Sequence, residues 1–214
     1  MRRLMFICCA LLTLAGCQSA YYSAMEKAGI HKRDILVDRV EDARDSQQQA
    51  KEQFKDALER YRSVVEVKGG DLEKRYDALN REYEASVASA QDVRTRIEDI
   101  EDVAEALFNE WESELTQYSN ASLKAASAKE LSRTRTEYRS LIQRMKAAEQ
   151  RIEPVLSVLR DQMLFLKHNL NARAISSLHG EYRTLQGNVD QLMNDMQRAI
   201  DEADSFIRRL QAEG

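Results

Sequence analysis

The sequence predicts an all-α protein: an elongated antiparallel four-helix coiled-coil bundle with up-down-up-down connectivity, preceded by a short N-terminal helix. Three observations lead to this prediction. The 214 residues include only seven glycines and one proline, which is too few turn-forming residues for a many-stranded fold. Charged residues make up 32% of the chain and apolar residues 43%, as in helices that bury one apolar stripe. Apolar residues also recur at alternating spacings of three and four, the heptad pattern of a coiled coil.

Residues 1–16 are predicted to form a lipoprotein signal peptide that is removed during export. Two arginines follow Met1, and the apolar run after them is only about twelve residues long, whereas a membrane-spanning helix needs roughly twenty. Residues 14–17 read Leu-Ala-Gly-Cys and resemble the lipobox of bacterial lipoproteins. The resemblance implies cleavage between Gly16 and Cys17, with a diacylglycerol and an N-acyl lipid such as palmitate on Cys17. The alternative is an ordinary secretory cleavage site beside an odd cysteine.

Residues 17–33 are predicted to hold the lipid anchor and a short helix over residues 20–28. Only Gln18 and Ser19 separate Cys17 from this helix, so no flexible linker lets the body reach far from its membrane. In lipoproteins of the enterobacterial type, an aspartate after the cysteine favours retention in the inner membrane, and this chain has Gln18 there. We therefore expect a lipid-anchored protein at the periplasmic face of the outer membrane.

The start of the short helix carries apolar side chains that need a surface to cover them. Tyr21, Tyr22 and Met25 are expected to pack on the protruding end of the second long helix near Trp111. The alternative is that the two tyrosines rest at the lipid interface. The N-terminal segment, the loop over residues 119–126 and the C-terminus are expected at one end of the bundle, which would be the tethered end.

Residues 34–214 are predicted to form the bundle, and its first two long helices are separated by a glycine turn. The first helix is expected to start near Asp34, with an apolar seam that continues to Val64. The pair at residues 69–70 is Gly-Gly, which interrupts the seam. Asp71 is a suitable N-cap for the second helix, whose seam continues without a slip to Trp111.

The third and fourth long helices are predicted from a capping box and a second break. Residues 127–130 read Ser-Ala-Lys-Glu, a capping box that would begin the third helix. Pro154 lies inside this helix, where it is expected to kink the axis without ending the helix. A break near residues 169–174 precedes the fourth helix, whose seam runs from Leu178 to Leu210.

Facing positions along the seams complement one another in volume when the helices are folded back as antiparallel hairpins. Ala57 then faces Tyr83, and Ala104 faces Leu141, so that large side chains meet small ones as a close-packed core requires. The alternative is one continuous rod that pairs with other chains. Polar residues at seam positions, such as Gln47, are expected to fix the register or to fill a tight gap.

No residues assemble a recognisable catalytic or metal-binding motif, so we expect no enzyme activity, no metal and no cofactor beyond the covalent lipid. Removal of residues 1–16 takes away two arginines, and the formal charge of −4 becomes −4 − 2 = −6. An acidic body has no bulk attraction to nucleic acid, which we therefore exclude as a partner.

The end of the third helix departs from the regular pattern and is the main candidate for partner contacts. Residues 163–166 are apolar on every side of the helix, including Met163, Leu164 and Phe165, so a single buried face cannot cover them. An additional intrachain contact is the expected cover, with a partner protein as the alternative. Polar candidates at the same end are Lys68, His168 and Arg173.

The leading functional hypothesis is a structural or adaptor lipoprotein that docks another envelope component through a helix face or its distal tip. The alternative is a module that holds a lipid or a peptide between helices near residues 163–166.

Three segments support a family resemblance: residues 21–27 (Tyr-Tyr-Ser-Ala-Met-Glu-Lys), residues 31–37 (His-Lys-Arg-Asp-Ile-Leu-Val) and residues 69–76 (Gly-Gly-Asp-Leu-Glu-Lys-Arg-Tyr). In these the chain resembles an uncharacterised family of proteobacterial envelope lipoproteins. The resemblance implies class and location and brings no known activity.

Overall fold

The computed structural model describes residues 21–22, 24–66, 71–169 and 172–212, and for residues 172–177 it describes the backbone only. The predicted signal peptide, Gly16, Cys17 and Lys68 lie outside the described residues. Within the described part, the chain is helical and contains no strand. The predicted all-α bundle is therefore confirmed.

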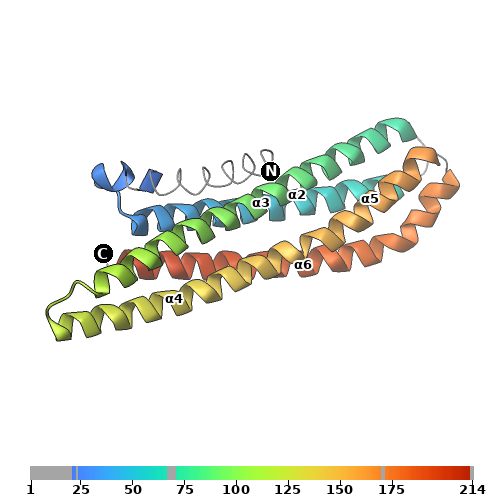
Figure 1. Cartoon of the computed structure of the whole chain (residues 1–214). Helices are drawn as coiled ribbons and strands as arrows, with labels where there is room; N and C mark the ends of the chain where they lie inside the picture. The colour runs from blue at the N-terminus through green and yellow to red at the C-terminus, as the bar shows by residue number, and fades with distance from the viewer. Residues whose placement is uncertain (1–20, 23, 67–70, 170–171, 213–214) are drawn as a thin grey trace, which may run out of the picture.

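Five long helices form four arms of the bundle, because two of the helices follow one another along a single arm (Figure 1). The helices are α2 (Lys32–Glu66), α3 (Leu72–Leu115), α4 (Ala121–Gln150), α5 (Ile152–His168) and α6 (Ala172–Ala212). The arm of α4 and α5 packs against α3 and α6, and α2 also packs against α3 and α6. The α4–α5 arm and α2 are thus diagonal to each other in an up-down-up-down bundle.

Polar contacts between neighbouring arms show that each pair is antiparallel, since the residue number rises on one helix as it falls on the other. The contacts include Ser46 with Asp92, Gln53 with Glu82, Arg94 with Glu149, Lys146 with Glu101, Arg151 with Asp195, and Arg209 with Glu137. These pairs fall within a few residues of the register that volume complementarity predicts.

The core is a continuous column of buried apolar side chains contributed by all four arms. Its largest fully buried side chains include Phe54, Tyr61 and Phe206. Among the buried polar residues on the seams, Ser86 and Gln47 differ in their bonding. The Ser86 hydroxyl donates to the Glu82 carbonyl at 2.7 Å, whereas both amide atoms of Gln47 lack a protein partner.

The N-cap of α3 agrees with the sequence prediction, and the start of α4 does not. The Asp71 carboxylate accepts a hydrogen bond from the Lys74 backbone N–H, as predicted. The capping box predicted at residues 127–130 was wrong, because Asn120 caps the helix about two turns earlier through the N–H groups of Ser122 and Leu123. Ser127 lies inside α4, where its hydroxyl accepts a hydrogen bond from the Trp111 indole at 2.8 Å.

Pro154 has a stronger effect than the expected kink. The chain leaves the α-helix for one residue at Arg151, whose N–H bonds the Ala148 carbonyl at 3.1 Å, and α5 begins at Ile152. Pro154 then lies in the first turn of α5, where a missing N–H removes no helical hydrogen bond. A continuous helix would instead bring the proline ring against the Gln150 carbonyl. The third helix was expected to continue through Pro154, and this was wrong. α5 is a new helix that extends the same arm of the bundle.

The short N-terminal helix, the α3–α4 connection and the C-terminal end of α6 lie at the same end of the bundle, as predicted (Figure 1). Lys32, the first residue of α2, contacts Glu110 near the end of α3 at 3.0 Å. The Arg33 guanidinium donates to the Leu210 carbonyl in the last turn of α6, where a cation is favoured by the helix dipole. The other end, which we call the distal tip, contains the end of α5 and the start of α6.

Candidate functional site

The N-terminal helix turns back sharply before α2 begins. Residues 21–22 and 24–27 are helical, and the helix ends in a Schellman motif. In this motif the Gly29 N–H bonds the Glu26 carbonyl at 2.9 Å, and the Ile30 N–H bonds the Met25 carbonyl at 3.0 Å. Gly29 has φ 83°, a left-handed conformation that costs a side-chain-bearing residue about 1–2 kcal/mol. The turn lays the N-terminal helix against the flank formed by α2 and α3.

Tyr22 is the buried residue through which the N-terminal helix packs on the flank. Its side chain belongs to the core, and burial raises the pKa of its phenol, with a further contribution from the nearby Asp102 carboxylate. Packing of this helix on α3 was expected around Trp111; Glu26 of the helix does lie near Glu110, next to Trp111 in the sequence, whereas Tyr22 lies further along α3. The Gly29 turn directs the chain back along α3 toward its middle, so Tyr22 lies near Asp102. Tyr21 remains 44% exposed.

A largely buried cation, Lys32, binds the other end of the helix. The Lys32 ammonium donates to the carboxylates of Glu26 and Glu110, and the Lys32 side chain is only 11% exposed. Burial disfavours the ammonium, but the two carboxylates outweigh this cost and raise the pKa of Lys32. The hydrogen bond from Lys32 lowers the pKa of Glu26. We call these three residues the N-terminal latch. Sequence reasoning missed the latch, although Gly29 followed by Ile30 is a helix-ending signal that could have located its turn.

The latch predicts a dependence of helix docking on pH with two limits. Because the folded pKa of Glu26 lies below its usual 4.5, its contribution is present above pH 4.5 and is lost as the pH falls further. Because the folded pKa of Lys32 lies above 10.5, its contribution is present below pH 10.5 and is lost at higher pH. The steady-state heteronuclear ¹⁵N NOE of the Glu26 and Gly29 amides is expected to fall on acidification below about pH 4.

A Lys32→Met variant is expected to reverse the effect of acid. At neutral pH the carboxylates of Glu26 and Glu110 repel each other without the cation, and the helix undocks; acidification neutralises both groups and restores docking. Lys27→Met, at an exposed position of the same helix, is the control and leaves the NOE unchanged. A Lys32→Met protein whose helix stays ordered at neutral pH would show that the latch does not hold it.

At the distal tip, the structure separates the apolar candidates into buried and exposed side chains. Met163 is buried in the core, as intrachain cover predicts. Leu164 and Phe165 are 55% and 41% exposed, so that prediction was wrong for them. The reason is that α5 packs mainly on α3 and α6, and Leu164 and Phe165 lie on the face that these two helices leave uncovered. His168 is also exposed, at the last residue of α5. We call Leu164, Phe165 and His168 the distal patch.

The described part of the structure does not show whether the remaining sequence candidates belong to this patch. Arg173 lies in the first turn of α6, but its side chain is outside the described part, as are Lys68, Gly16 and Cys17. Among the described residues, no group of three or more His, Cys, Asp or Glu is placed to hold a metal ion. None of the helices in that part of the chain is both long enough and apolar enough to span a bilayer.

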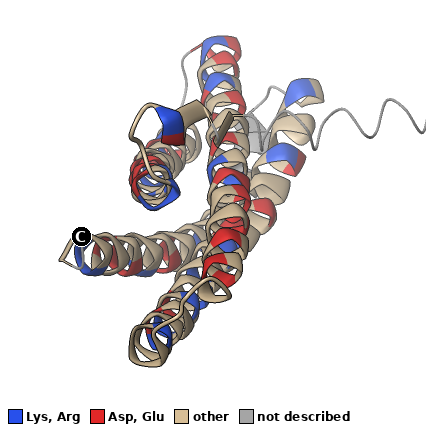
Figure 2. Ribbon diagram, turned by 60° about the vertical axis from the view of Figure 1, so that its left-hand side comes forward, with Lys and Arg blue, Asp and Glu red and all other residues tan. Residues whose placement is uncertain are grey.

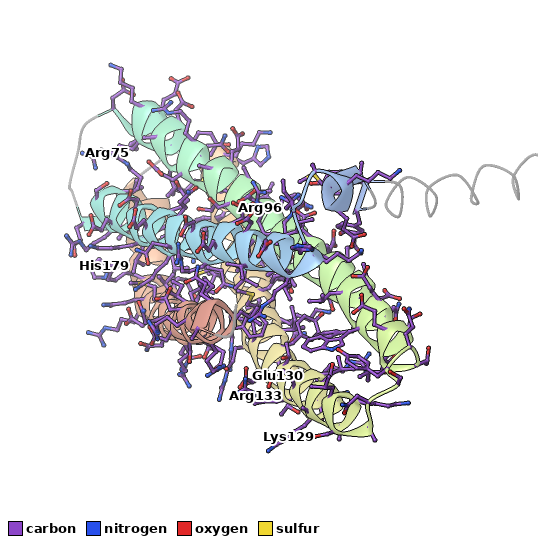
Figure 3. All side chains as sticks on the ribbon, turned by 90° about the vertical axis from the view of Figure 1, so that its left-hand side faces the viewer. Arg75, Arg96, Lys129, Glu130, Arg133 and His179 are labelled. Atoms are coloured by element: carbon purple, nitrogen blue, oxygen red, sulfur yellow. The ribbon has the colours of Figure 1, made fainter. Side chains whose placement is uncertain are left out.

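The surface carries charges of both signs over its whole length (Figure 2). Many of them pair within or between helices, as Glu130 and Arg133 do at 2.6 Å on the exposed start of α4 (Figure 3). Surface recesses are lined by such pairs; in one of them Arg94 bonds Glu149 and Lys146 bonds Glu101. A recess whose charges already neutralise one another gives no preference for an anionic or a cationic ligand.

Comparison with known protein families matches residues 21–210 to DUF2959, described as a protein of unknown function. The chain belongs to the DUF2959 family. The DUF2959 match includes the N-terminal latch, the bundle and the distal patch, so these features lie in the family domain itself. No curated protein and no solved structure matches the chain.

Proposed function

We propose that this DUF2959 protein is a lipoprotein anchored through Cys17 at the periplasmic face of the outer membrane. In this proposal it acts there as a structural or adaptor module without catalytic activity. The observation that carries the adaptor role is the distal patch. Two adjacent large apolar side chains, Leu164 and Phe165, are exposed on a helix that the bundle holds in place from two sides. Exposed apolar residues held on a well-packed element are typical of protein contact sites.

The alternative is a module that holds a lipid or a peptide between helices near residues 163–166, and it is less well supported. Met163 and Leu166, which face inward there, are both almost completely buried against the core. An apolar ligand between the helices would have to displace these side chains. The cost would be similar to that of opening a cavity in a packed core, about 2–5 kcal/mol for one large side chain.

Photo-crosslinking in intact cells tests the adaptor role. A photoreactive amino acid at position 164 is expected to give a discrete protein adduct, because Leu164 points away from the bundle. The same amino acid at position 139, an exposed site on α4 remote from the patch, is the control and is expected to give none. A Phe165→Asp substitution should abolish the adduct from position 164. Equal labelling at positions 164 and 139, or adducts with lipid only, would contradict the proposal.

A further inference from the structure

The N-terminal helix meets the flank of the bundle near the start of α2 and the end of α6, and the α3–α4 hairpin extends past it (Figure 1). Lys32 lies beside Glu110 on α3, whereas Tyr22 lies near Asp102, which is closer to the distal tip. From Asp102, α3 extends a further distance of about 45 Å to its distal end at Leu72, at 1.5 Å per residue.

In the opposite direction the α3–α4 hairpin extends almost as far. Lys146 faces Glu101 across the groove between α3 and α4 at 2.5 Å, which places Lys146 close to the level of Tyr22. From Lys146 back to its first residue, Ala121, α4 is about 37 Å long. Both ends of the bundle are therefore several tens of ångströms from the point at which the chain enters it.

The sequence sets a short limit on the tether. Four peptide units join Cys17 to Tyr21, and a fully extended chain spans at most about 3.6 Å per residue, or about 14 Å in total. This reach is less than half the distance to either end of the bundle. While the latch holds the N-terminal helix on the flank, a bundle anchored through Cys17 cannot stand upright on the membrane.

We propose that the flank formed by α2, α3 and the N-terminal helix rests on a zwitterionic lipid surface, with the long axis of the bundle along the membrane plane. This inference rests on the proposed lipid anchor. The outer side of the N-terminal helix fits such a contact, because Tyr21 is 44% exposed and Ile30, in the turn that follows, is 37% exposed. A tyrosine ring beside an aliphatic side chain is favoured at the lipid–water interface.

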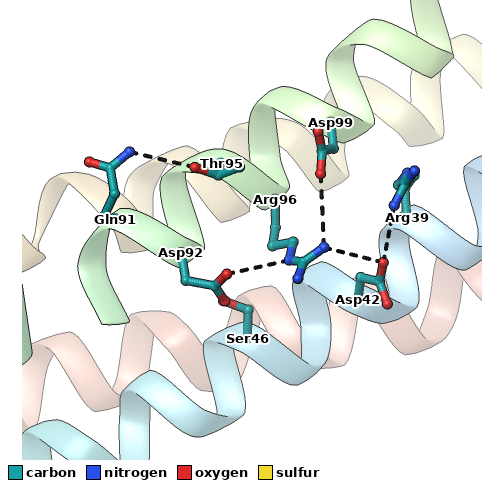
Figure 4. A network of polar contacts seen from close by, with 8 residues as sticks. All are labelled: Arg39, Asp42, Ser46, Gln91, Asp92, Thr95, Arg96 and Asp99. Carbon is teal, nitrogen blue, oxygen red and sulfur yellow. Dashed lines mark hydrogen bonds and ion pairs between the residues drawn. The ribbon is translucent and has the colours of Figure 1, made fainter. Parts of the chain in front are cut away.

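The charges of the flank determine which lipid it fits. Arg96 on α3 lies 3.5 Å from both Asp42 and Asp92 and 4.0 Å from Asp99, and Arg39 also contacts Asp42 (Figure 4). Carboxylates outnumber guanidinium groups in this network, and its arginines already face carboxylates. This part of the flank therefore offers no unpaired positive charge to attract anionic head groups, and a zwitterionic surface is the better match.

This orientation also determines on which side of the bundle, toward the lipid or away from it, the distal patch lies. The α4–α5 arm is diagonal to α2, so it lies on the side of the bundle that is away from the lipid. Leu164 and Phe165 on that arm would be presented to the aqueous compartment, where a soluble partner domain could reach them.

Neutron reflectometry of the mature lipoprotein on a supported phosphatidylethanolamine–phosphatidylcholine bilayer tests the orientation. A bundle that lies flat is expected to give a protein layer about 20–30 Å thick, since two layers of helices with side chains occupy about 20 Å and the N-terminal helix on the flank adds up to about 10 Å. An upright bundle would give a layer of more than about 60 Å, the length of α3. A layer of that thickness for the unaltered protein would overturn the proposed orientation.

A tether variant provides the matched control without touching the fold. Insertion of about fifteen Gly/Ser residues between Ser19 and Ala20 lengthens the reach to more than 60 Å when extended, and it is expected to give a thicker and more diffuse layer. A layer that stays thin after the insertion would show that the short tether does not set the orientation. Failure of the unaltered mature protein to remain on the bilayer at all would instead contradict the lipid anchor, so the two proposals fail by different results.

Discussion

Tyr61→Ala is expected to lower the free energy of unfolding by about 3–5 kcal/mol, the range for removal of a buried aromatic side chain. Tyr61 is fully buried near the distal end of α2. Its ring stacks on that of Tyr182 with centroids 6.2 Å apart, and its hydroxyl donates to the Leu178 carbonyl at 3.1 Å. One side chain thus joins α2 to α6 both by packing and by a hydrogen bond.

Tyr61→Phe separates the two contributions, because it keeps the ring and removes only the hydroxyl. It is expected to cost about 1 kcal/mol, the net value of a typical hydrogen bond. Leu164→Ala, at an exposed position near the same end, is the control and should change the unfolding free energy by no more than about 0.5 kcal/mol. Urea denaturation followed by circular dichroism measures all three. A Tyr61→Ala variant no less stable than Leu164→Ala would contradict the contact between α2 and α6.

Gln47→Leu is expected to change stability in the opposite direction and to raise the unfolding free energy by about 1–2 kcal/mol. Gln47 is almost completely buried in the middle of α2, and neither its amide nitrogen nor its amide oxygen has a protein partner. Its neighbours on the seam, Ala43 and Ala50, carry no polar side-chain group, and Arg44 and Lys51, one turn to either side, bond to Asp204 and Gln197 on α6 instead. Replacing an unsatisfied buried polar group by an apolar group of similar size removes its desolvation cost.

Gln49→Leu is the matched control, since Gln49 is exposed on the same helix and its replacement should leave stability unchanged within about 0.5 kcal/mol. The two variants are compared by thermal and urea denaturation. A Gln47→Leu protein less stable than the parent would mean that the amide is satisfied by internal water and stabilises the bundle. In that case our interpretation of the bundle centre would have to change.

The bundle itself could be predicted from the sequence because its determinants are local and repeated. Heptad spacing identifies the buried face of each helix, and Asp71 marks a helix start through bonds to its own first turn. The start of α4 could not be predicted in this way, because Asn120 and Ser127 are both acceptable caps. The sequence does not reveal that Trp111, from another helix, binds the Ser127 hydroxyl.

The N-terminal latch was beyond sequence reasoning for a different reason. Lys32 and Glu110 are 78 positions apart, and no periodic pattern indicates that they meet. The path of the N-terminal helix depends on one left-handed residue, Gly29, whose conformation decides whether the chain continues away from the bundle or returns along it. The exposure of Leu164 and Phe165 likewise depends on which faces of α5 its neighbours cover, and composition alone does not contain this information.

The proposals on location, orientation and partner all depend on lipidation of Cys17, and mass spectrometry of the N-terminal peptide of the mature protein tests it most directly. The account predicts a chain that begins at Cys17 and carries a diacylglyceryl group on sulfur and an acyl group on nitrogen. In a Cys17→Ser variant the signal should remain uncleaved. A mature chain that begins at another residue, or one that begins with an unmodified cysteine, would contradict the account.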